Sequence, residues 1–109
     1  MTILDERLKH YEIEIEIFDI NTIEEEISQS YFQRLLLSKH KKDLTYEDLE
    51  RLYKLDIKAV ELYNSVKDKD TIAVEYLGKI VNEFANKNIA EYEKSHKQKR
   101  VWGDQNTTL

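Results

Sequence analysis

The side chains best suited to metal chemistry lie near the C-terminal end of the sequence. Glu93 stands three residues before His96, and on a helix this spacing places a carboxylate and an imidazole on one face. Helical bundles hold paired iron ions with two such Glu-x-x-His pairs and two further inward glutamates. The other histidines do not complete the set, because His10 follows Glu6 by four residues and His40 has no glutamate at the required offset. We therefore predict no metal ligand and no cofactor.

A basic and aromatic segment overlaps the Glu93–His96 pair, which is half of the di-iron motif. Residues 94–100 read KSHKQKR, and the only tryptophan of the chain follows shortly afterwards. Cations can neutralise phosphates and an aromatic ring can stack on a base, which is the chemistry of single-strand binding. The same cations also suit the negative end of a helix dipole. Nucleic-acid binding is therefore kept as an alternative, and it would use Lys94, Lys97, Lys99, Arg100 and Trp102.

Other catalytic chemistries lack the residues that they need. The chain has no cysteine, which removes disulfides, thiol nucleophiles and zinc–thiolate sites. It has no glycine-rich phosphate loop and no serine in a nucleophile elbow. We name no catalytic residue and predict that the protein is not an enzyme.

Composition limits the class of protein. A chain of 109 residues is most simply one domain, and two glycines without a proline are too few for the turns of an all-β fold. The net charge of −5 is unevenly placed, because residues 1–30 hold nine acids and two bases. No run approaches the roughly 18 apolar residues of a membrane span. Charges also stand where a signal peptide would have its apolar core. We expect a cytoplasmic protein without a membrane partner.

Three stretches carry the apolar spacing of amphipathic helices. The clearest begins after Thr45, a good N-cap, and predicts a helix over residues 46–67. A second helix is predicted over 71–95, following the polar turn KDKD. A third is predicted over 22–40, with three glutamates at its start and lysines at its end, as the helix dipole favours. Its predicted buried stripe consists of Ile23, Ile27, Tyr31 and Leu35.

The segment EIEIEIF, residues 12–18, has two interpretations. Its strict alternation fits a half-buried strand, but a strand needs a partner to complete its hydrogen bonds. As part of a helix over 3–18, it continues a coiled-coil-like seam with spacing four, three, four, three: Leu4, Leu8, Tyr11, Ile15 and Phe18. A second apolar row then lies on the opposite side: Ile13, Ile17 and Ile20. We favour the helix, which must be covered on both sides, either by a central place in the bundle or by another chain.

Two segments, IFDINTIEEE (17–26) and SKHKKDL (38–44), resemble with gaps parts of the T4-type phage recombination mediators. The resemblance covers less than half of the chain and includes no diagnostic motif. It implies a small helical oligomer that loads recombinase onto single-stranded DNA, and it assigns a role to no residue.

These patterns predict an all-α fold, a small bundle of three or four antiparallel amphipathic helices with an irregular C-terminal tail. Residues 1–100 would form the single helical domain and 101–109 the tail. The predicted core is apolar and drawn from every helix: Leu8, Ile15, Ile27, Leu35, Leu49, Leu52, Val60, Leu77, Ile80 and Phe84.

The function expected from these elements is binding to another protein through helix faces, as an adaptor, inhibitor or assembly factor. The partner is another protein or a second copy of the chain. The predicted contact residues are Tyr11, Ile13, Ile17, Ile20 and Trp102. The alternatives are a nucleic-acid-associated accessory protein and, more remotely, a ferritin-like di-metal protein.

Overall fold

The computed structural model describes residues 3–96, and every regular element in that range is helical. The elements are α1 (Ile3–Glu16), α2 (Glu24–Lys39), the 3-10 helix η1 (Lys41–Asp43), α3 (Tyr46–Val66), α4 (Ile72–Ile80) and the π-helical η2 (Val81–Ala85). Residues 86–96 continue the last helix in α-helical form. The predicted all-α bundle is confirmed, and the predicted helices agree with the observed ones to within two residues at the described ends. The predicted tail, 101–109, lies outside the described residues.

Local chemistry explains where the helices begin. The hydroxyl oxygen of Thr45 accepts a hydrogen bond from the backbone N–H of Asp48 at 3.2 Å, which caps α3. Thr71 caps α4 in the same way, accepting from the N–H of Val74 at 3.3 Å. The N-cap of α2 is Ile23, whose side chain makes no cap hydrogen bond. The three glutamates of its first turn instead stabilise this end through the helix dipole.

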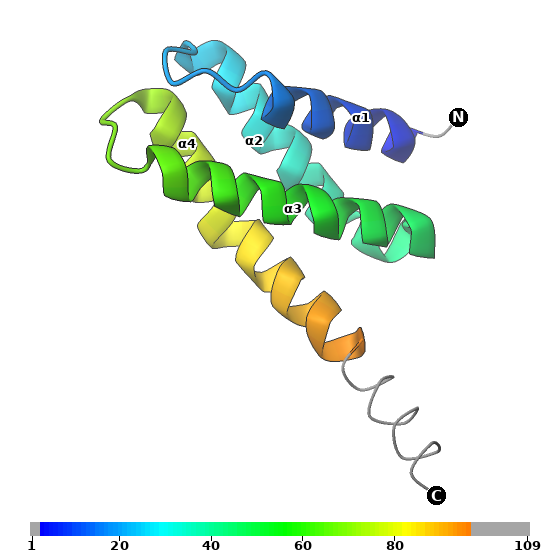
Figure 1. Cartoon of the computed structure of the whole chain (residues 1–109). Coiled ribbons are helices and arrows are strands. Elements are labelled where there is room, and N and C mark those ends of the chain that lie inside the picture. The colour runs from blue at the N-terminus through cyan, green and yellow to red at the C-terminus, as the bar shows by residue number, and fades with distance from the viewer. Residues whose placement is uncertain (1–2, 97–109) are drawn as a thin grey trace, which may run out of the picture.

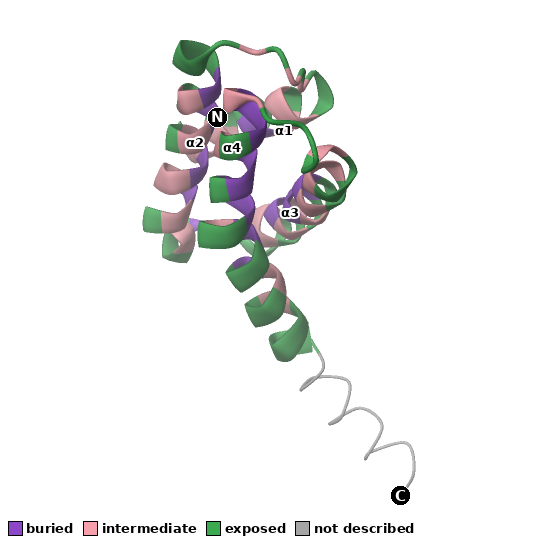
Figure 2. Ribbon diagram, turned by 90° about the vertical axis from the view of Figure 1, so that its left-hand side faces the viewer, coloured by how far each residue is buried: buried purple, intermediate pink, exposed green. Residues whose placement is uncertain are grey.

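Consecutive helices reverse direction, so α1 and α3 run one way and α2 and α4 the other (Figure 1). Contacts join α1 to α2 and α3, and α4 to the same two helices. The inward faces of the helices are buried, whereas residues 86–96 are largely exposed and extend beyond the bundle (Figure 2). The arrangement gives α1 two neighbours and leaves part of its circumference open.

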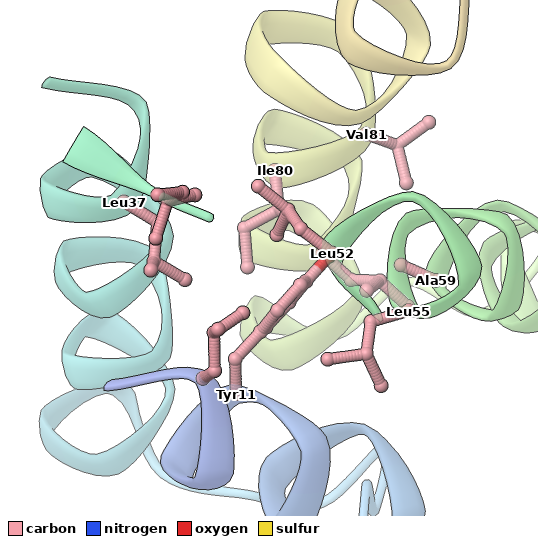
Figure 3. Close-up of a cluster of buried hydrophobic side chains, with 10 residues drawn as sticks. Tyr11, Leu37, Leu52, Leu55, Ala59, Ile80 and Val81 are labelled. Atoms are coloured by element: carbon pink, nitrogen blue, oxygen red, sulfur yellow. The ribbon is translucent and has the colours of Figure 1, made fainter. Parts of the chain in front are cut away.

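The core lies where the four helices meet, and side chains from all of them converge there (Figure 3). The predicted core residues Leu8, Ile27, Leu52, Leu77 and Ile80 are buried. The remaining predicted members are half-buried: Ile15, Leu35, Leu49, Val60 and Phe84. The expected stripes therefore face the core on α1, α3 and α4.

On α2 the buried face is rotated from the predicted one. The sequence pattern places Ile23, Ile27, Tyr31 and Leu35 on the stripe, and of these Ile27 alone is buried. The other buried side chains of α2 are those of Ser30, Arg34 and Leu37. Two of the four buried residues, Ser30 and Arg34, are polar, so a search for apolar residues alone misplaces the buried face of α2. Arg34 turns inward because it has a buried partner on α3.

That partner is Asp56, which forms a polar hub with one residue from each of the other helices. Its two carboxylate oxygens accept from the guanidinium of Arg34, at 3.0 Å from Nε and 2.8 Å from Nη2. The Tyr11 hydroxyl donates at 2.6 Å and the Asn88 amide donates at 2.8 Å. Nη1 of Arg34 donates to Ser38 at 2.7 Å. Asp56 is 0% exposed and Arg34 is 1% exposed, so the pair is enclosed.

The hub fixes the mutual register of the helices. Buried charges are tolerated when they are paired and hydrogen-bonded, and here one carboxylate receives four hydrogen bonds. Burial, together with the charge of Asp56, raises the pKa of the Tyr11 phenol well above its ordinary value, so the phenol stays a donor. Sliding any one helix would leave a charge or donor unpaired. We therefore assign the hub a structural role.

Gly78 on α4 is buried against α3. A Cβ at this position would lie 3.0 Å from Cε1 and 3.2 Å from the hydroxyl of Tyr63. Replacing Gly78 with alanine should gain about 1 kcal/mol in helix propensity, and displacing the half-buried Tyr63 ring should cancel most of that gain. We expect the free energy of unfolding in urea to change by less than about 1 kcal/mol. A loss above about 3 kcal/mol would mean that the ring cannot move.

Candidate protein interface

The segment EIEIEIF is helical, and it presents two different faces. Helix α1 reaches Glu16, and the N–H of Ile17 still donates to the carbonyl of Ile13 at 2.9 Å. Leu8 and Tyr11 on one face are 0% and 1% exposed. Ile13 and Ile17 on the other face are 50% and 70% exposed. The strand interpretation is therefore wrong, and two members of the second apolar row, Ile13 and Ile17, are uncovered within residues 3–96.

A third isoleucine extends this uncovered surface across the α1–α2 connection. Ile23, the N-cap residue of α2, is 58% exposed and lines the same groove as Ile17. We call Ile13, Ile17 and Ile23 the isoleucine patch. The sequence interpretation missed Ile23 because it counted this residue in the buried stripe of α2. The available signal was its position before the glutamate-rich first turn, where a helix has not yet begun.

The groove beside the patch has a volume of about 530 Å³. It runs between the C-terminal turn of α1, the connection and the first turns of α2. Its apolar lining comes from Ile17, Phe18, Ile23 and Ile27, of which Ile27 is buried at its base. A concave apolar surface with polar groups at its edge is the usual form of a binding site for an anchoring side chain.

The polar lining of the groove carries only negative charge. Glu14, Asp19 and Glu26 line it, and residues 12–26 contain seven acids and no base. Oε2 of Glu14 is buried and has no hydrogen-bond partner within residues 3–96. Burial raises the pKa of the Glu14 carboxyl, an effect that a hydrogen bond with Ser30 and the charge of His10 partly offset. The edge of the groove therefore favours a cation that could pair with this carboxylate.

The structure separates the predicted contact residues. Ile13 and Ile17 lie on the uncovered face, whereas Ile20 is half-buried in the connection and does not line the groove. The inclusion of Tyr11 is corrected, because its ring is buried and its hydroxyl is bonded to Asp56. Trp102 lies outside the described residues.

The other end of the molecule carries the half-motif and the start of the basic segment. Tyr92 stacks between Tyr53 and His96, with ring centroids 4.1 and 4.0 Å away. Oε2 of Glu93 accepts a hydrogen bond from the Tyr53 hydroxyl at 3.0 Å. Lys94 is exposed. The other residues named for nucleic-acid binding lie beyond the part of the chain that the structure describes: Lys97, Lys99, Arg100 and Trp102.

Two properties of the described residues bear on other functions. Residues 3–96 contain no group of three or more histidine or carboxylate side chains placed to hold a metal ion. In the same range no helix combines the length and apolar character that crossing a bilayer requires.

The chain matches no protein-family model, no curated protein and no solved structure. The resemblance of residues 17–26 and 38–44 to the phage recombination mediators thus has no support from these comparisons. What the chain can bind has to be argued from its own surface.

Proposed function

We propose that this chain is a non-enzymatic protein–protein interaction module, an adaptor, inhibitor or assembly factor that assembles with itself or another protein. The isoleucine patch is its contact surface. The observation that supports this most strongly is the exposure of Ile13 and Ile17 on a helix whose opposite face buries Leu8 and Tyr11. A helix that is apolar on two sides is stable in water when both sides are covered. Within residues 3–96 no helix covers this face of α1, and we assign its cover to another chain.

The free energy gained by burying the isoleucine patch is large enough to support a specific contact. Burying an isoleucine side chain contributes about 1.5 to 3 kcal/mol relative to leaving it in water. Three side chains that are already partly covered would together contribute on the order of 3 to 5 kcal/mol. The acids around the patch add selectivity, because they repel acidic partners and attract basic ones.

Replacing Ile13 and Ile17 together with serine tests this proposal. We expect the double variant to lose self-association in sedimentation velocity, or capture of its partner by cross-linking in a host lysate, relative to the parent chain. Because both side chains are already exposed, its free energy of unfolding as a dilute subunit should stay within about 0.5 kcal/mol per site.

The matched control is Ile3→Ser, on the same helix and 69% exposed, but distant from the groove. It should behave like the parent chain. If oligomer size, partner capture and stability all remain unchanged in the double variant, the second face of α1 is not an interface.

A further inference from the structure

The chemistry of the groove defines what can occupy it. Its base is apolar and its edge is acidic, and Glu14 brings a buried carboxylate oxygen that has no hydrogen-bond partner among the described residues, 3–96. A fitting occupant carries an apolar anchor for Ile17, Phe18 and Ile27 and at least one cation within reach of Glu14. A neutral apolar segment would leave the carboxylate buried and unpaired, which is costly.

One segment of this chain has that composition. Residues 94–102 read KSHKQKRVW, so three lysines and one arginine precede Val101 and Trp102, without an acid among them. The charges complement those of residues 12–26, and tryptophan is the side chain most often found as an interface anchor. The other cluster of bases, residues 39–42, is already folded into the bundle, where Lys41 is paired with Glu91 at 2.7 Å.

To reach the groove of its own subunit, residues 97–102 would have to reverse direction after His96 and run back fully extended along the helix. Phe18 and Ile27 of the groove also line a small cavity with Leu77 on α4. His96 lies 19 residues after Leu77 along one continuous helix (96 minus 77), which corresponds to roughly 28 Å at 1.5 Å per residue. The α1–α2 connection and the C-terminal end of the last described helix therefore lie at opposite ends of the bundle (Figure 1). The six residues from 97 to 102 span at most about 20 Å when fully extended.

We propose that residues 97–102 of one copy dock into the groove of a second copy, with Trp102 against the isoleucines and a lysine or arginine on Glu14. This inference rests on the proposed function and names the partner as the chain itself. Such a contact joins two different surfaces of the same chain. Reciprocal docking between two copies closes a two-fold dimer, and docking onto successive copies gives a ring or an open row of subunits.

Trp102 provides the probe, because it is the only tryptophan in the chain. The full-length protein is followed by tryptophan emission and sedimentation velocity over the same concentration series. We expect the emission to shift to the blue as the mass rises above 13.1 kDa, the mass of one chain. Sodium chloride at about 1 M, where the Debye length is about 3 Å, should reverse both changes.

Variants of the groove separate this contact from others. Ile17→Ser combined with Ile23→Ser should leave the emission at its exposed wavelength and the mass at that of one chain, whereas Ile3→Ser should match the parent. Emission of exposed tryptophan in an assembled protein would overturn the inference. A blue shift without a rise in mass would mean docking within one chain, which also overturns it. In either case the proposed function survives if Ile13→Ser with Ile17→Ser still abolishes assembly or capture.

Glu14→Gln gives a second test that does not depend on the apolar contacts. The raised folded-state pKa means that the favourable contribution of Glu14 is present at low pH and is lost as the pH rises through that pKa. At neutral pH the glutamine variant should therefore have a higher melting temperature as a dilute subunit. Its self-association should be about tenfold weaker, because a charge-assisted hydrogen bond is lost.

The control for this variant is Glu16→Gln, at an exposed position that does not line the groove. It removes the same charge and should weaken assembly by less than about twofold, since its carboxylate is screened by solvent. If Glu14→Gln raises the melting temperature but leaves the association constant unchanged, Glu14 is not part of the contact and the inference fails.

Discussion

Replacing Asp56 with alanine is expected to remove about 3 to 5 kcal/mol from the free energy of unfolding. The Arg34 guanidinium would remain enclosed in the bundle without its counter-charge, and the donors of Tyr11 and Asn88 would lose their acceptor. Nearby rings do not replace the carboxylate, although those of Tyr11 and Phe84 lie 5.9 and 5.5 Å from the guanidinium carbon. Domains of this size have a free energy of unfolding of about 5 to 15 kcal/mol, so the loss would be a large fraction of the total stability.

Urea unfolding followed by circular dichroism measures this effect, with Asp68→Ala at an exposed position as the control. The double variant Arg34→Met with Asp56→Leu should regain the part of the loss that comes from the unpaired guanidinium, whereas the donors of Tyr11 and Asn88 still lack their acceptor. The difference between the double variant and the sum of the single ones gives the coupling energy. A loss below about 1 kcal/mol for Asp56→Ala would contradict the assignment of the hub as the element that fixes helix register.

The second large effect is expected on the buried face of α1. Leu8→Ala should destabilise the chain by about 2 to 5 kcal/mol, because it removes a fully enclosed side chain from the core. Ile13→Ala on the same helix should change the stability of the dilute subunit by less than about 0.5 kcal/mol. The two substitutions remove similar apolar groups, so a difference between their stability losses reports which face of α1 carries the residue.

Thermal and urea unfolding at a concentration where the chain is a single subunit would measure both variants. At higher concentration, Ile13→Ala should become destabilising relative to the parent, because assembly stabilises only the folded parent chain. Equal losses for the two variants in the dilute subunit would mean that Ile13 is packed inside the fold, and the two-faced description of α1 would be wrong.

Most of the secondary structure could be predicted from the sequence, for a local reason. Apolar residues recur at three and four along α3 and α4, and threonines precede both helices at the capping position. The alternating segment was harder because a period of two is compatible with a strand and with a helix that is apolar on two sides. The seam through Leu8 and Tyr11 favoured the helix, and both side chains are buried.

The hub could not be predicted from an apolar pattern, because such a pattern assigns charged residues to the surface. Its signal was present in the spacing. Asp56 stands four residues after Leu52 and three before Ala59, both of which are buried. Arg34 stands seven residues after Ile27 and three before Leu37 in the same way. Two opposite charges at core positions of different helices are a reason to expect a buried pair.

The candidate interface was foreseeable in part. Ile13 and Ile17 were placed on a second face by helix geometry alone. The groove was not foreseeable, because it depends on how the connection brings Ile17 and Ile23 to the same opening. The unpaired oxygen of Glu14 likewise depends on the packing of α1 against α2.

The most direct test of the interface is methyl NMR of isoleucine-labelled protein, recorded across the concentrations over which the sedimentation mass rises. We predict shift changes at the methyl groups of Ile13, Ile17 and Ile23, and at Ile27 in the groove, while those of Ile3 and Ile80 stay constant. A chain that remains a single subunit throughout would contradict the self-association of this surface. An assembled chain in which the methyl groups of the isoleucine patch do not move would contradict the account of the patch itself.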